Sequence, residues 1–170
     1  YGKGVAWNGL TAVNETPSGA ESTKLYADDI KYLDIRSAEE FGATIEAYSS
    51  PEEFDACDGT AELAAGVNIG QQNRKGFGFC YRSTIGNDTE YNNYGYKLHI
   101  IYGLTASPSE RSYSTVNDSP EAATLSWEVS STPVNVAGFK PTSIVTINSK
   151  KINAEALKEI EDALYGTESE

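Results

Sequence analysis

The chain has little of what metal sites and cofactor sites require. Its 170 residues include one histidine, two cysteines and no methionine. No HExxH motif, CxxC motif or second histidine occurs, which excludes the common zinc sites, and we expect neither a metal nor a cofactor. The single histidine, His99, stands inside a strand pattern, where a packing or surface residue is typical.

Motifs of catalytic and nucleotide chemistry are also missing. No GxSxG sequence occurs, and Gly76–Tyr81 begins like a dinucleotide fingerprint but lacks its third glycine. Asp55–Gly59 lacks the alternating oxygen ligands of a calcium loop. Adjacent carboxylates would suit a glycosidase, but in a chain with 25 acids solvated faces explain them better. We therefore expect that the protein is no enzyme.

The two cysteines stand in unlike contexts, with Cys57 at the end of an acidic helical turn and Cys80 inside a strand pattern. Such a pair predicts free thiols in a reducing compartment, and a disulfide between them is the alternative.

Basic residues and long apolar runs are scarce. Thirteen basic residues against 25 acidic ones give a formal charge of -12, which argues against tight wrapping around nucleic acid. An acidic surface does suit a polyanion that must slide past without sticking. No apolar run approaches the roughly 20 residues of a membrane span, and no leader is visible, so we expect a soluble protein.

Strand patterns fill the chain from residue 26 to about residue 130. Apolar and polar residues alternate with a period of two, and aromatic and β-branched residues predominate. The clearest runs are Gly42–Tyr48, Phe77–Arg82, Tyr94–Tyr102 and Leu125–Ser130. These runs predict a mostly β, antiparallel protein. At this length one domain over residues 1–166 is expected, followed by a frayed acidic tail at 167–170.

Two helical segments interrupt the strand patterns. Ser50 followed by Pro51 and two glutamates is a helix-start signature, so a short helix to about Ala56 is expected. Near the end Asn153 can cap a helix whose apolar stripe packs across a sheet and which Gly166 terminates. The stripe consists of Leu157, Ile160 and Leu164.

Two polar segments, residues 14–23 and 105–120, predict long loops. Loops of this length are either functional or merely solvated, and here they would contact a neighbouring subunit or vary freely. The 11 tyrosines also have two interpretations. Tyrosine is enriched at interfaces, but alternation places several of these residues on a core face.

The order of segments carries a family resemblance. Residues 5–15, 25–32 and 42–54 are followed by 94–98, 119–128, 132–134 and the closing helix up to Thr167. Taken in this order, they resemble the major tail tube proteins of tailed bacteriophages, closest to those of long-tailed phages and prophages of Gram-positive bacteria.

The resemblance implies a two-sheet antiparallel β-sandwich or half-barrel, with a short helix after residue 50 and a C-terminal helix. Hexameric rings of such a structural subunit would stack into a hollow tube in the virion, assembled in the host cytoplasm. Its acidic lumen would conduct DNA during ejection without specific binding. Partners would be other copies and the tape measure, terminator and distal tail proteins, with no membrane. The inner tube of a contractile tail or tail-like bacteriocin, and a secreted β-sandwich binding module, are the alternatives.

Candidate site residues follow from this picture. In Leu25–Asp58 carboxylates recur between apolar residues at strand spacing, which predicts one buried and one charged face. With Leu25–Tyr48 as an inner hairpin, we expect the acids Asp29, Asp34 and Glu46 to face the lumen, although a register slip of one residue would reverse this. For contacts between rings and subunits we expect Glu15, Glu21, Arg74, Lys75, Glu110 and Arg111.

Overall fold

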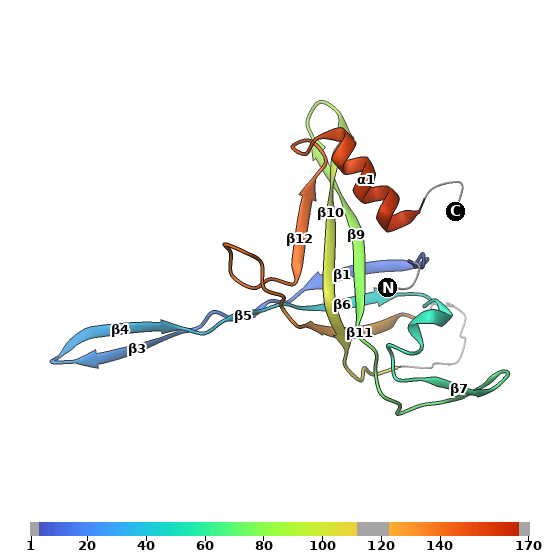
Figure 1. The fold of residues 1–170 in the computed structure, drawn as a ribbon, viewed down its shortest axis with the longest axis horizontal. Helices are drawn as coiled ribbons and strands as arrows, with labels where there is room; N and C mark the ends of the chain where they lie inside the picture. The colour runs from blue at the N-terminus through green and yellow to red at the C-terminus, as the bar shows by residue number, and fades with distance from the viewer. Residues whose placement is uncertain (1–3, 112–122, 167–170) are drawn as a thin grey trace, which may run out of the picture.

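The computed structural model describes residues 4–111 and 123–166, which form antiparallel strands, one α-helix and one 3₁₀ turn (Figure 1). The mostly β fold class with a C-terminal helix is confirmed. The strands are β1 (Leu10–Glu15), β2 (Ser18–Gly19), β3 (Ser22–Ala27), β4 (Ile30–Arg36), β5 (Glu39–Glu40), β6 (Gly42–Ala47), β7 (Ala61–Ala64), β8 (Val67–Ile69), β9 (Phe77–Asn87), β10 (Tyr91–Ala106), β11 (Leu125–Ser131) and β12 (Ile144–Asn148). The helices are the 3₁₀ turn η1 (Glu52–Phe54) and α1 (Ala154–Tyr165).

The main sheet is built around β10. Its strand order is β1-β6-β11-β10-β12, and β9 also pairs with β10. The first part of β10 pairs with β9 and β12, whereas its end pairs with β11. Between them lies Gly103, which has a φ of +67° and where an added Cβ would lie 2.8 Å from the Thr132 carbonyl oxygen, too close for a side chain. The sheet therefore bends there into two halves that run across one another (Figure 1).

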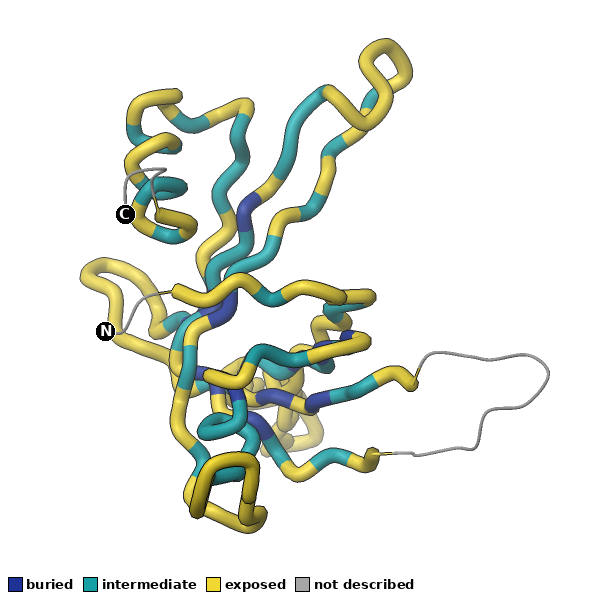
Figure 2. The backbone as a smooth tube through the Cα atoms, turned by 90° about the vertical axis from the view of Figure 1, so that its right-hand side faces the viewer, coloured by how far each residue is buried: buried dark blue, intermediate teal, exposed yellow. Residues whose placement is uncertain are grey.

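The main hydrophobic core takes its residues from strands of both halves, and Figure 2 colours the buried positions dark blue. β6 and β11 contribute Ile45 and Trp127, and β9 and β10 contribute Phe79 and Ile101. Trp127 and Phe54 stack edge to face at 5.4 Å between ring centroids, an arrangement that aromatic pairs favour. The short η1 turn thus places one ring in the core. Pro51, rather than the expected Ser50, precedes this turn, and no side chain caps it.

The opposite face of β9 and β10 is covered by α1. Alternation places Ile101 in the main core and Leu98 on the helix side, where its side chain is fully buried. Arg82 of β9 meets Glu161 of α1 at 3.0 Å. The helix begins as expected, since the Asn153 side chain accepts a hydrogen bond from the Glu155 amide at 3.0 Å. The expected packing of this helix across a sheet is confirmed.

Residues 10–47 form one long ribbon that leaves the body. β1 pairs with β6, then β2 with β5, then β3 with β4, which project far from the main sheet (Figure 1). Two expectations were wrong here. Residues 14–23 are one side of this ribbon rather than a loop, because their backbone pairs with residues 35–44. Leu25–Tyr48 is not a hairpin, because β4 turns back onto β3 while β6 lies between β1 and β11.

Candidate assembly surface

The projecting hairpin β3–β4, residues 22–36, is called the arm below. Its register places two sets of side chains on opposite faces, because directly paired residues of an antiparallel ladder share a face. An extra residue at Tyr32 shifts the pairing between Leu25 and Tyr26 and keeps the two sets apart. One face carries Thr23, Leu25, Ala27, Ile30, Leu33 and Ile35, and the other Ser22, Lys24, Tyr26, Lys31, Asp34 and Arg36.

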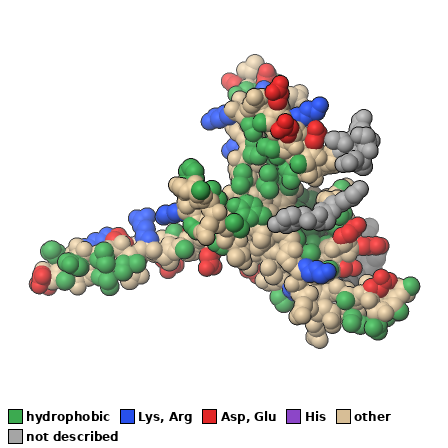
Figure 3. Space-filling view, in the orientation of Figure 1, with side chains coloured by type: hydrophobic (Ala, Val, Ile, Leu, Met, Phe, Trp, Pro, Cys, Tyr) green, Lys and Arg blue, Asp and Glu red, His purple; other side chains and the backbone are tan. Residues whose placement is uncertain are grey.

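The apolar face of the arm is uncovered by the described part of the chain. Its four large side chains are between 45% and 64% exposed, whereas Leu98 and Ile101 of β10 are at most 1% exposed. Figure 3 shows hydrophobic side chains along the length of the arm. Leaving such a face in water costs about 25 cal/mol per Å² relative to burying it, so the arm is suited to packing against another molecule. These four are Leu25, Ile30, Leu33 and Ile35.

The turn and the polar face of the arm hold two of the expected lumen acids. Asp29 lies in the two-residue turn, where it and Asp28 both have positive φ angles, as a type I′ turn requires. Asp34 forms an ion pair with Lys31 on the polar face, and hydrogen bonding to Lys31 lowers the pKa of the Asp34 carboxyl. Both acids therefore lie on the arm, on a different sheet from the third expected acid, Glu46.

Glu46 lies on the outer face of the body sheet. Its strand directs Ala43, Ile45 and Ala47 into the core, so Thr44 and Glu46 point the other way. Glu46 pairs with Ala12 on β1 and Ser126 on β11, and Thr44 pairs with Asn14 and Glu128 on the same two strands. Three strands thus build a shallow polar face with two carboxylates. Sequence reasoning did not single out Glu128, although its alternation with Trp127 and Val129 was a sufficient signal.

Three of the expected contact residues are engaged within the chain. The Tyr81 hydroxyl donates a hydrogen bond to Glu15. Arg74 pairs with Asp58 at 3.2 Å and donates to the Ala106 and Ser107 carbonyls, and Arg111 pairs with the same carboxylate. Because the Asp58 side chain is only 8% exposed, this arrangement fixes the end of β10 to the turn after η1.

The other three expected contact residues are exposed. Glu21 lies on the ribbon beside the arm, where its carbonyl accepts from the Ser37 amide. Glu110 lies in the irregular stretch after β10. The predicted loop at 105–120 begins inside β10, since Thr105 and Ala106 pair with β11, and its residues 112–120 are outside the described range.

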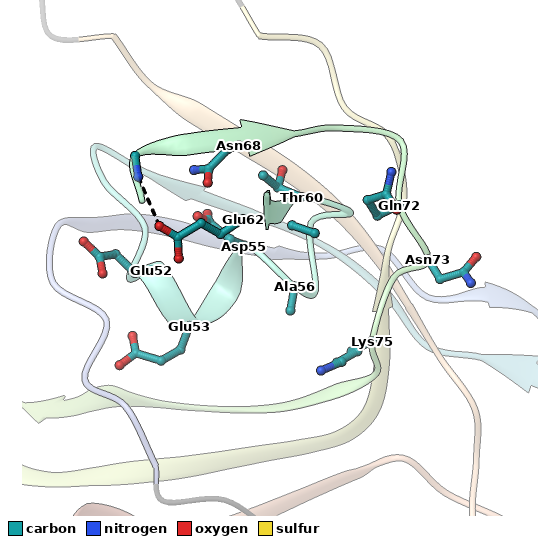
Figure 4. A pocket seen from close by; sticks show the side chains of 12 residues that line it. Glu52, Glu53, Asp55, Ala56, Thr60, Glu62, Asn68, Gln72, Asn73 and Lys75 are labelled. Carbon is teal, nitrogen blue, oxygen red and sulfur yellow. Dashed lines mark hydrogen bonds between the residues drawn. The ribbon is translucent and has the colours of Figure 1, made fainter. Parts of the chain in front are cut away.

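Lys75 lines a hollow of about 580 Å³ between η1 and the β7–β8 hairpin (Figure 4). Four carboxylates border it, of which Glu62 accepts a hydrogen bond from the Gly66 amide at 3.1 Å. Among the residues with described positions, no group of three possible ligands is arranged to hold a metal ion. The hollow is an acidic part of the surface, and its carboxylates are Glu52, Glu53, Asp55 and Glu62.

His99 takes part in a chain of polar contacts that resembles a nucleophile, base and acid. Its Nε2 lies 2.8 Å from the Ser83 hydroxyl, and its buried Nδ1 lies 3.9 Å from a carboxylate oxygen of Glu15, too far for a hydrogen bond. Ser83 and His99 both stand inside paired strands, where the ladder engages the backbone amides that an oxyanion would need. The Tyr81 ring stacks on the imidazole at 4.6 Å. We assign the cluster to holding β1 against β9 and β10.

Both thiols are free, as expected from their contexts. Burial raises the pKa of the Cys57 and Cys80 thiols, so neither is an activated nucleophile. Cys80 lies 3.5 Å from the Tyr165 hydroxyl, beneath the end of α1.

No known protein family model matches this chain, and no curated protein matches it in sequence. Within residues 4–111 and 123–166, no helix is both long and apolar enough to cross a membrane. Sequence reasoning missed the arm, although two alternating runs separated by Asp28 and Asp29 are a hairpin signal.

Proposed function

We propose that the chain is a structural subunit of a bacteriophage-type tail tube, in which hexameric rings stack around a lumen that conducts DNA. The observation that carries the proposal is the arm. A ribbon that extends from the body with an uncovered apolar face has a use only when another copy or another protein packs on it.

The free edges of the main sheet support the same function. In the described chain β1 pairs only with β6, β12 only with β10, and β9 only with β10. Each therefore offers a row of backbone donors and acceptors on one side. A ring in which neighbouring copies join such edges would close the sheet and remove them.

The polar outer face of β1, β6 and β11 is the best candidate for the lumen wall. Among the described residues, its only charged side chains are the carboxylates Glu46 and Glu128 and its other side chains are short, so it lacks basic groups that would hold a phosphate backbone. This replaces the inner hairpin that the sequence predicts with a three-strand surface. Asp29 and Asp34 belong to the arm and are assigned to subunit contacts instead.

Electron microscopy of the purified chain tests the proposal. Negatively stained samples over a range of protein and salt concentrations should contain rings or tubes. A chain that stays monomeric under all of these conditions would contradict the proposed function.

Nuclease protection then tests the lumen wall. The double variant E46K/E128K, assembled with short duplex DNA present, should retain DNA that nuclease cannot reach, because reversed charges attract phosphates. The matched control E159K places a lysine on the exposed side of α1, and any DNA that it binds should be degraded. Equal protection in both would show that the face of β1, β6 and β11 does not line the lumen.

A further inference from the structure

A second surface on the body complements the arm. Between Glu128 and Glu155 the chain contains no aspartate or glutamate, which is its longest run without an acid despite 25 acids in all. This run forms the end of β11, an irregular hairpin at residues 132–143, and β12. It contributes three lysines, so this part of the molecule is positive on a chain with a formal charge of -12.

The same segment exposes apolar side chains. Phe139 at the tip of the 132–143 hairpin is 80% exposed, more than any other large hydrophobic residue described. Val134 and Val136 on the same hairpin are also exposed. The acceptor surface is defined here as these three residues together with Lys140, while Lys150 and Lys151 lie at the other end of β12. The hairpin projects from the body on the same side as the arm in the view of Figure 1.

None of the three lysines of this acid-free run forms an ion pair with the described residues. The basic residues of the next longest acid-free run, residues 63–87, differ in this respect. Two of them are used inside the chain, Arg74 by Asp58 and Arg82 by Glu161. Lys140 and Lys151 are exposed, and Lys150 lies over the Tyr94 ring at 4.9 Å.

We propose that the apolar face and acidic tip of one copy's arm dock on the acceptor surface of a second copy. The arm matches the acceptor surface in kind, since it carries four large aliphatic residues and ends in Asp28 and Asp29. Its three acids and three basic residues leave it without net charge, so it approaches an acidic neighbour with little repulsion. The arm projects away from its own body, so its partner surface is that of another copy (Figure 1).

The proposed contact joins two different surfaces, the arm of one copy and the acceptor surface of the next. A contact between unlike surfaces passes from copy to copy and generates closed rings or open filaments rather than isolated dimers. The inference rests on the proposed function and specifies the receiving surface for the arm. It also assigns Phe139 as the centre of the contact, since interface energy concentrates in a few large side chains near the middle.

Mixing two defective variants tests the proposal. L25S/L33S removes the arm's apolar contacts and leaves the acceptor surface intact, and V136S/F139S does the reverse. Each alone should be monomeric by light scattering coupled to size exclusion. Mixed, they should form a one-to-one heterodimer, because one intact arm and one intact acceptor surface remain.

Other outcomes separate the alternatives. If the arms pair with each other, V136S/F139S will still self-associate and the mixture will contain no heterodimer, which overturns the inference. If wild-type chain assembles and V136S/F139S assembles equally well, the acceptor surface is wrong while the proposed function stands. If wild-type chain never assembles, the proposed function itself fails. Far-ultraviolet circular dichroism and urea unfolding establish that every variant is folded.

Exchanging the charges of Lys140 and of the two aspartates at the arm tip gives a second test, in which assembly is measured. K140E should raise the concentration needed for assembly about tenfold or more, and adding D28K/D29K should restore it. The control K158E makes the same charge change on the exposed side of α1 and should leave assembly unchanged. An equal effect of K140E and K158E would attribute the loss to net charge and overturn the docking.

Discussion

The arm and the β9–β10 hairpin are two extended hairpins with different surroundings. Both carry apolar residues at alternate positions, but Leu98 of β10 is fully buried whereas Leu33 of the arm is 46% exposed. The difference is α1, which comes more than fifty residues after Leu98 and lies over β9 and β10. Alternation therefore shows that a strand face needs a cover, and only the tertiary structure shows whether the same chain provides it.

The largest expected difference between the two hairpins comes from truncating Leu98 and Leu33. L98A should lower the free energy of unfolding by about 2–5 kcal/mol, because it leaves a cavity beneath the helix. L33A should change the unfolding of the dilute monomer by less than about 0.5 kcal/mol, because the side chain is exposed there. Urea unfolding at low protein concentration measures both. A large loss of monomer stability in L33A would mean that the arm folds back onto its own body.

Hydrogen exchange measures the difference between the arm and the β9–β10 hairpin before and after assembly. Arm amides have little covering them and should exchange fast in the monomer, while those of β9 and β10 beneath α1 should exchange slowly. On assembly, protection of the arm amides should rise about tenfold or more, with little change in β9 and β10. Unchanged exchange in the arm of assembled protein would exclude it from the subunit contacts.

Gly19, at the base of the arm, offers a smaller test of whether assembly depends on the direction in which the arm projects. Gly19 has a φ of +85°, and an added Cβ would lie 2.2 Å from the Ala38 carbonyl oxygen, so G19A must move the ribbon. We expect G19A to weaken assembly and to leave the melting temperature of the monomeric body almost unchanged. G66A is the matched control, since Gly66 also has a positive φ but nothing within 4 Å of the added carbon. Normal assembly of G19A would show that arm direction is not critical.

Much of the body could be predicted because local signals and burial agree there. The alternating runs became β6, β9, β10 and β11, and Asn153 and Gly166 bound α1 as expected. The candidate site was less predictable. Residues 14–23 have the composition of a loop, yet their backbone pairs with residues 35–44 across a long ribbon, and composition alone does not encode such pairing. Asp29 and Glu46 were grouped by spacing in sequence, but the turn at Asp28 and Asp29 sends them to different sheets.

The smallest expected effect concerns how firmly α1 covers its sheet. Burial, followed by the contact with Cys80, raises the pKa of Tyr165 to about 12 from its ordinary value of 10, so the folded state holds this proton more tightly than the unfolded chain. The contribution to stability is complete below pH 10 and is lost as pH rises from about 10 to 12. The hydrogen bond to Glu161 likewise raises the pKa of Tyr96 beneath the same helix.

Because Tyr165 is 54% exposed, solvent weakens this effect, and Y165F should change the melting temperature by less than about 2 °C at pH 11. The slope of melting temperature against pH between 10 and 12 should be shallower in Y165F than in wild type, while the two curves should run parallel below pH 9. An identical alkaline slope in both would place the loss elsewhere in the sheet. A shallower slope would show that the covered hairpin depends on this contact, which has no counterpart on the arm within the described chain.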